Sequence, residues 1–218
     1  LVRKYLHGIT ASGLHEALLG HYEFGGEVHV YSPAFRKEDI PTLSNISDHL
    51  VFNSLSQFQQ LAPLVRGQHS HTSIGLRVNP EHREVAVALY DPCAPNSRLG
   101  IKASELEGFD WSQVDGLHFH TLCQLNSDAL QRTLDAVEQK FATALQQVKW
   151  VNFGGGHHIT RKDYDIDLLC AQIDRISKRY QVQVYLEPGE AIALNTGYLV
   201  CTVLDIIPGE LPLAILDT

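Results

Sequence analysis

The chain has 218 residues, of which 44% are hydrophobic and 19% charged, and its formal net charge at pH 7 is −8. This composition excludes a disordered or fibrous chain, and the negative charge argues against a nucleic-acid partner. No apolar run reaches the roughly 18 residues of a membrane-spanning helix. The cysteines show no CxxC spacing and predict free thiols in a cytoplasmic protein: Cys93, Cys123, Cys170 and Cys201.

Seven short runs rich in β-branched and aromatic residues predict strands. In chain order they are residues 8–12, 27–33, 49–54, 73–80, 116–121, 150–156 and 182–189. Between them, residues 13–22, 126–147 and 163–180 carry apolar side chains at helical spacing. This alternation predicts parallel strands joined by crossover helices, with ligands bound at the polar, glycine-rich carboxyl ends of the strands.

Two regions break the alternation. Residues 81–115 predict an irregular excursion, and "GYLVCTVLDIIPG" with "LAILDT" predicts the start of an all-β region. Seven strands are one fewer than the eight of a (β/α) barrel, and the alternative, an open doubly wound sheet, lacks its GxGxxG turn. The chain contains no methionine, so we expect it to begin inside a longer one.

The glycines Gly154, Gly155 and Gly156 follow a predicted buried strand in "WVNFGGGHH". Bare backbone amides at a strand end can cradle an anion, usually phosphate. The alternative is a tight turn that needs positive φ angles. Both interpretations place these residues at the ligand-binding edge of the sheet.

The motif "GLHFH" puts His118 and His120 on the same face of a strand. Such a pair can bind a metal, with His157 and His158 as further ligands, or can place one ring flat against a planar ligand. It can also be a buried, hydrogen-bonded pair without a ligand. The residues alone leave the three alternatives open.

Charged residues follow two further strands. Glu187 in "YLEPGE" needs a partner at that depth, either an arginine, a metal, a protonated ring nitrogen or a structural salt bridge. Gly189 can lend another amide to an anion. Arg77 in "GLRVNP" stands at a different strand end, with a salt bridge as its alternative role.

The motifs "TASGLHE", "LRVNP", "LHFHTLC", "FGGG" and "EPGE" resemble, in this order, those of the pyridoxal-phosphate (PLP) decarboxylases with an alanine-racemase-like barrel. The stretches "WVNFGGGHHITRKDYD" and "VYLEPGEAIALNTGYLV" are similar to the carboxynorspermidine (carboxyspermidine) decarboxylase branch. The resemblance spans essentially the whole chain. It implies an α/β fold with about seven of the eight strands of a PLP-binding (β/α)8-type barrel over residues 1–194, and the beginning of a C-terminal β domain over residues 195–218.

The resemblance also implies residue roles. His120 would stack on the pyridine ring and Glu187 would pair with its nitrogen, as catalytic residues. Cofactor-binding roles fall to Gly154, Gly155, Gly156, Gly189, Arg77, Ser12, Glu16 and Cys123. Glu190 replaces an arginine of ornithine-type enzymes, so we expect it to bind the amines of the substrate instead of phosphate.

The implied reaction is decarboxylation of carboxynorspermidine or carboxyspermidine by a cytoplasmic homodimer that uses PLP, with no metal, membrane or nucleic-acid partner. The family's cofactor-bearing lysine precedes the "TASGLHE" motif. All seven lysines of this chain are predicted to lie in helices or loops, so we expect the segment alone to be inactive. The alternatives are a metal-dependent barrel hydrolase using the four histidines of "GLHFH" and "GGGHH", and a non-catalytic homologue.

Overall fold

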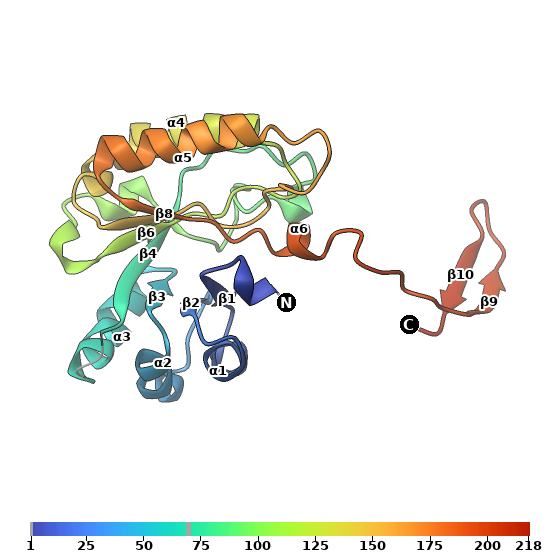
Figure 1. Cartoon of the computed structure of the whole chain (residues 1–218), viewed down its shortest axis with the longest axis horizontal. Coiled ribbons are helices and arrows are strands. Elements are labelled where there is room, and N and C mark those ends of the chain that lie inside the picture. The colour runs from blue at the N-terminus through green and yellow to red at the C-terminus, as the bar shows by residue number, and fades with distance from the viewer. Residues whose placement is uncertain (1, 69–70) are drawn as a thin grey trace.

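The main body of the protein is a parallel sheet with the strand order β1-β2-β3-β4-β6-β7-β8 (Figure 1). The computed structural model describes residues 2–68 and 71–218. The strands are β1 (Gly8–Ala11), β2 (Glu27–Tyr31), β3 (His49–Phe52), β4 (Ser73–Asn79), β6 (Gly116–His118), β7 (Trp150–Asn152) and β8 (Gln183–Tyr185). Each coincides with one of the seven predicted runs, so the predicted parallel α/β sheet is confirmed.

Helices cover the outer face of this sheet (Figure 1). They are α1 (Leu14–Leu19), α2 (Ile40–Ile46), α3 (Leu55–Gly67), α4 (Ser127–Leu145) and α5 (Ile166–Tyr180), whereas the short α6 (Gly189–Ala193) lies beyond the end of β8 at the carboxyl edge. A π-helical turn, η2 (Gly20–Phe24), continues α1. Within the described residues, no helix combines the length and hydropathy needed to cross a membrane.

The predicted irregular excursion between β4 and β6 is confirmed, with one addition. It contains the short 3-10 helices η4 (Ala88–Tyr90), η5 (Ala103–Leu106) and η6 (Trp111–Gln113). It also contains an unpredicted two-residue strand, β5 (Ile101–Lys102), which pairs beside β4. The prediction that Lys102 lies in a helix or loop is therefore wrong, because its backbone pairs with Asn79.

The main core lies between the helices and one face of the sheet. Because successive side chains of a strand point to opposite faces, every second residue enters this core. Leu50, Leu117 and Val151 occupy it from three strands and are fully buried. The predicted apolar stripe of α4 faces it, with Leu134 and Val137 both buried. This packing fixes which strand residues face the opposite side.

The opposite face carries a buried aromatic layer. The rings of His29, His49 and Trp150 stack in series, with centroids 3.9 Å and 4.3 Å apart. The indole of Trp150 covers Gly116, where a Cβ atom would lie 2.0 Å from the ring. This layer forms the floor beneath the carboxyl ends of the strands.

The buried His49 of this layer predicts a pH-dependent stability. Burial, followed by the neighbouring His29, lowers the pKa of His49 to about 3, although Asp115 opposes the shift. Only the unfolded chain takes up a proton there, so stability is lost as the pH falls from about 6.5 towards 3. We expect His49→Phe to reduce the loss of unfolding free energy between pH 7 and pH 5, by at most about 1.4 kcal/mol per pH unit. Urea unfolding at both pH values measures this, and an unchanged pH slope would contradict it.

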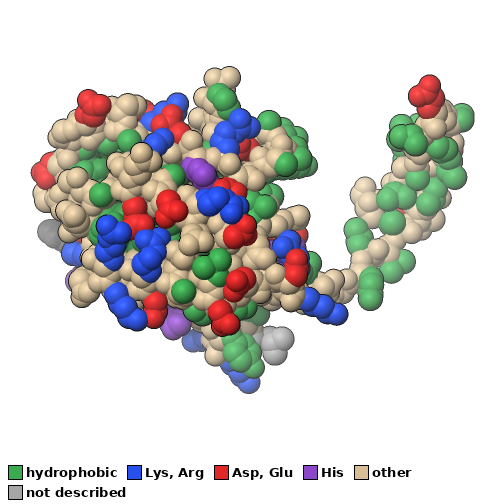
Figure 2. Space-filling model, turned by 90° about the horizontal axis from the view of Figure 1, so that it is seen from above, with side chains coloured by type: hydrophobic (Ala, Val, Ile, Leu, Met, Phe, Trp, Pro, Cys, Tyr) green, Lys and Arg blue, Asp and Glu red, His purple; other side chains and the backbone are tan. Residues whose placement is uncertain are grey.

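The C-terminal residues form a separate two-stranded antiparallel sheet, β9 (Val203–Ile207) and β10 (Leu213–Leu216). Figure 2 shows that hydrophobic side chains gather on this hairpin, away from the main body. Ile206, Leu213 and Ile215 are among its exposed apolar residues. The structure thus agrees with the predicted change to β structure after the barrel-like sheet, while the domain boundary at residue 194 stays a prediction.

Candidate active site at the carboxyl edge of the sheet

Polar residues from three neighbouring strands meet at the carboxyl edge of the parallel sheet. Arg77 of β4 pairs in register with His118 of β6, which pairs in turn with Asn152 of β7. Residues in register share a face, so all three side chains lie on the face opposite the helix-covered core. All three are at least 95% buried.

Glu187 joins this row from the segment that follows β8. Its Oε1 accepts a hydrogen bond from Asn152 Nδ2 at 2.7 Å. Its Oε2 lies 3.5 Å from His118 Nε2, which is long for a hydrogen bond. The Glu187 side chain is 15% exposed, so the carboxylate is held by Asn152 and is still accessible from the edge of the sheet.

The electrostatics of the site keep Glu187 ionised. Burial alone would raise the pKa of this carboxyl, but His118, His120 and the Asn152 amide outweigh burial and lower it. Burial, with Arg77 as the second cause, lowers the pKa of His120 to about 4. At pH 7 the site therefore contains a carboxylate beside a neutral imidazole.

The glycine turn after β7 is constrained by its φ angles and by residues of the protein that pack against it. Gly154 and Gly156 have φ angles of +71° and +82°, which favour glycine. A Cβ atom at Gly156 would lie 2.1 Å from Leu122 O, and one at Gly155 would lie 2.7 Å from Glu187 O. The positive-φ interpretation is thus confirmed, and the turn packs tightly between the loop after β6 and the end of β8.

The backbone amides of the turn differ in their availability to an anion. Gly154 N donates to Asn152 Oδ1 at 2.8 Å, and Gly189 N donates to Glu187 O at 2.8 Å. Gly155 N makes only a long contact of 3.4 Å with His120 Nδ1. Gly156 N has no hydrogen-bond acceptor in residues 2–68 and 71–218. Phosphate binding by these glycines stays a prediction, and it fits Gly155 and Gly156 best.

His120 lies beside this turn, and Arg77 stabilises the backbone of His120. A Cβ atom at Gly155 would lie 3.1 Å from the His120 ring, so the ring covers the glycine. The buried Arg77 donates from Nη2 to His120 O at 3.2 Å and lies over the Tyr31 ring, 4.5 Å from its centroid. Arg77 therefore fixes the backbone that carries His120.

Two residues of this site were not predicted from the sequence. Asn152 stands directly before "FGGG" in what reads as a buried strand, and its period-two spacing from Gly154 was the available signal. Tyr31 stacks on His118 at a centroid distance of 5.2 Å and donates from its hydroxyl to Asn53. A tyrosine at a strand end gives no comparable signal, because it is also a common core residue.

The other predicted site residues have no hydrogen bond to Glu187 in the described part of the chain. Ser12 and Glu16 bond to each other after β1, with Ser12 N and Oγ both 2.6 Å from Glu16 Oε2. The Cys123 backbone packs against Gly156. Glu190 accepts hydrogen bonds of 2.7 Å and 3.0 Å from the Gln124 side chain. Their roles as cofactor or substrate contacts stay predictions.

The metal-site alternative required the histidines of "GLHFH" and "GGGHH" to converge. Across the described ranges, no three His, Cys, Asp or Glu side chains are arranged to hold a metal ion. His157 instead places its Nε2 3.4 Å from Phe153 O, and His158 Nε2 lies 3.8 Å from Glu190 Oε1. The structure therefore gives no support to the hydrolase alternative.

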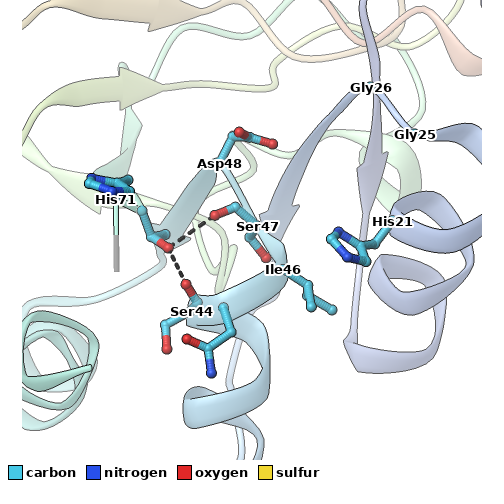
Figure 3. Close-up of a pocket in the computed structure, with 10 residues that line it drawn as sticks. His21, Gly25, Gly26, Ser44, Ile46, Ser47, Asp48 and His71 are labelled. Atoms are coloured by element: carbon cyan, nitrogen blue, oxygen red, sulfur yellow. Dashed lines mark hydrogen bonds between the residues drawn. The ribbon is translucent and has the colours of Figure 1, made fainter. Parts of the chain in front are cut away.

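A cavity of about 530 Å³ lies at the opposite, amino edge of the sheet. His21 faces Ile46 and Ser47 across it, and Asp48 and His71 complete its rim (Figure 3). Thr72, which also lines it, donates hydrogen bonds from Oγ1 to the carbonyls of Ser44 and Ser47. Because parallel α/β folds bind ligands at the carboxyl edge, the chemistry is assigned to Glu187 and its neighbours and not to this cavity.

The chain resembles known proteins in sequence. No family model matches the chain. A carboxynorspermidine/carboxyspermidine decarboxylase of Campylobacter jejuni is 47% identical over 218 residues, which are 100% of this chain and 56% of that protein. A carboxyaminopropylagmatine decarboxylase of Synechocystis is 41% identical over 207 residues, covering 94% of this chain and 53% of that protein.

Solved structures show the same similarity. The carboxynorspermidine decarboxylase of Campylobacter jejuni, complexed with norspermidine, superposes with a TM-score of 0.84 at 46% identity, covering 100% of this chain and 55% of that one. A diaminopimelate decarboxylase, at 17% identity and TM-score 0.76, shares the fold over 100% of this chain and 56% of its own. The chain spans about half the length of the curated relatives it matches. Over its whole length the chain is therefore similar to part of the carboxynorspermidine/carboxyspermidine decarboxylases, and it shares its fold with the solved decarboxylase structures.

Proposed function

We propose that the protein containing this chain decarboxylates carboxynorspermidine or carboxyspermidine with pyridoxal phosphate, and that this chain provides the ring and phosphate contacts of the cofactor. The observation that carries the proposal is the ionised Glu187, tied by Asn152 to the end of β7 and open to the carboxyl edge beside the glycine turn. Bound pyridoxal phosphate would supply an electron sink that stabilises the negative charge left on the substrate when CO₂ departs. The residues of this chain prepare the site for it.

Four polar groups of the site have different proposed roles. The Glu187 carboxylate accepts a hydrogen bond from a protonated ring nitrogen and so keeps the proton there. The neutral His120 ring lies against a planar partner without adding charge. Gly155 and Gly156 turn their amides to the phosphate, and Arg77 holds the His120 backbone in place. The contacts of Glu187 with Asn152 and of Arg77 with the His120 backbone support these roles.

The substrate class rests on two observations. Norspermidine is bound in the related Campylobacter jejuni structure. In this chain, Glu190 stands past Glu187 with its side chain 54% exposed, and its only hydrogen-bond donor in the described ranges is Gln124. An exposed carboxylate beside the cofactor end of the site suits a cationic amine. We also expect a cytoplasmic homodimer, and both features stay predictions.

A substrate panel tests the proposed function. The purified protein, loaded with pyridoxal phosphate, is expected to release CO₂ from carboxynorspermidine and carboxyspermidine faster than from diaminopimelate or ornithine. Binding of pyridoxal phosphate without CO₂ release from any of the four would instead support the non-catalytic homologue. Activity that depends on added zinc and not on pyridoxal phosphate would contradict the proposal.

Exchange of the charge at Glu190 tests the substrate contact. We expect Glu190→Arg to raise the KM for the polyamine substrate by roughly tenfold, because an attractive charge becomes a repulsive one at a partly exposed site. Affinity for pyridoxal phosphate, measured by titration, should change much less. The exposed Glu107→Arg provides a control with the same change in net charge. Lower cofactor affinity with an unchanged KM would assign Glu190 to the cofactor instead.

A further inference from the structure

We infer that Asn152 is a positioning residue that locks Glu187 and the glycine turn into one unit. Asn152 is 2% exposed at the end of β7. Its Nδ2 donates to Glu187 Oε1 at 2.7 Å and its Oδ1 accepts from Gly154 N at 2.8 Å. The two contacts use opposite ends of one carboxamide, so they fix its orientation.

A third hydrogen bond closes the arrangement into a ring. Glu187 N donates to Gly154 O at 2.8 Å. Asn152, Gly154 and Glu187 are therefore each bonded to the other two, and Glu187 is held by its backbone and by its side chain. Since Asn152 and Gly154 are buried and the Glu187 side chain is only 15% exposed, water cannot readily replace the bonds of the ring.

Only a carboxamide satisfies both neighbours of residue 152. Aspartate can still accept from Gly154 N but turns an oxygen towards the Glu187 carboxylate, so two negative charges would meet at hydrogen-bond distance. Leucine, with a similar volume, would leave a buried carboxylate oxygen and a buried amide without partners. Asparagine is thus required by the chemistry of the ring and not only by packing.

The consequence for the site is mechanical coupling. The glycine turn faces the expected phosphate, and Glu187 faces the expected ring nitrogen. With the ring intact, a shift of the turn carries the carboxylate with it, so the distance between the two ends of the binding site stays constant. This last step rests on the proposed function, whereas the ring itself does not.

A double-mutant cycle tests the ring without cofactor or substrate. We expect Asn152→Asp to lower the urea midpoint at pH 7 by roughly 1 M or more, because it opposes two buried carboxylates. Adding Glu187→Gln restores a donor facing an acceptor with reversed polarity, so the double variant should regain at least half of the loss. The deficit of Asn152→Asp alone should also shrink at acidic pH, where a carboxyl takes up a proton.

Asn79 offers a matched control. It is 4% exposed at the end of β4, and its side chain donates to Leu99 O and accepts from Glu81 N, but it does not contact Glu187. The loss caused by Asn79→Asp should add to that of Glu187→Gln without rescue. If Asn152→Asp does not fold, the inference requires the double variant to fold.

Additive losses at Asn152 and Glu187, or a double variant that stays unfolded, would overturn the inference. In the protein loaded with pyridoxal phosphate, Asn152→Asp should lower kcat more than it raises KM and should shift the absorbance maximum of the bound cofactor. A rescued cycle with no such effect would leave the ring standing and count against the proposed function alone. The two failures are therefore distinguishable.

Discussion

Replacing Gly156 by alanine is expected to destabilise the protein by about 3 kcal/mol or more. The new methyl group would meet Leu122 O at 2.1 Å, and the φ angle of +82° strains any residue with a Cβ atom. Both costs fall on a turn that packs tightly against the loop after β6 and has little room to relax. Urea unfolding of the parent and variant proteins measures the difference.

Gly189→Ala is the matched control for this substitution. No atom lies within 4 Å of a Cβ atom built at Gly189, so the change should alter stability by less than about 0.5 kcal/mol. Equal losses at Gly156 and Gly189 would mean that the close approach to Leu122 is not what requires glycine. A stable Gly156→Ala protein would contradict the described geometry of the turn.

Glu187→Gln is expected to lower kcat by about 100-fold to 1000-fold while pyridoxal phosphate still binds. A neutral amide can accept a hydrogen bond from the ring nitrogen, but it cannot hold the proton there as a carboxylate does, and one such electrostatic contact is worth roughly 3–4 kcal/mol of barrier. Steady-state kinetics and cofactor titration of the protein containing this chain measure both effects. Because the glycine turn is unchanged, the affinity of the variant for pyridoxal phosphate is expected to stay within a few-fold of that of the parent protein.

The exposed Glu107→Gln removes a carboxylate outside the site and provides the control. Its kcat is expected to match that of the parent protein. Near-normal turnover in Glu187→Gln would remove this residue from the catalytic machinery. Loss of cofactor affinity with unchanged kcat would instead make Glu187 a binding residue only.

The strands were predictable because their signal is local and their packing is simple. The apolar Leu117 and Val151 alternate with the polar His118 and Asn152. Such an alternating run has few stable arrangements other than a strand in a sheet that helices cover on one face. The helix over residues 163–180 was harder to delimit. It begins at Ile166, after the cap Asp165, and Ile166 is 45% exposed although it fits the apolar stripe. Helix ends depend on a single side-chain bond, which spacing does not reveal.

The candidate site was predictable as a set of residue types, whereas its hydrogen bonding was not. Glu187, His120 and the glycine turn were found because charge, aromatic rings and glycine are unusual at buried strand ends. The reason for the glycines differs in part from the predicted one, since Gly154 already donates to Asn152. Asn152 escaped notice because its partners are 2 and 35 residues away, and only the folded chain brings them together.

The central claim is that the carboxyl edge around the glycine turn and Glu187 binds pyridoxal phosphate. It is tested most directly by NMR on isotope-labelled protein during addition of pyridoxal phosphate. We predict saturable shifts of the Gly155 and Gly156 amide signals and of the His120 ring signals. In Glu187→Gln, only the shifts of the His120 ring signals should become smaller. Shifts confined to the opposite cavity around His21 and Asp48, or no response from the glycine turn at saturating cofactor, would contradict the account.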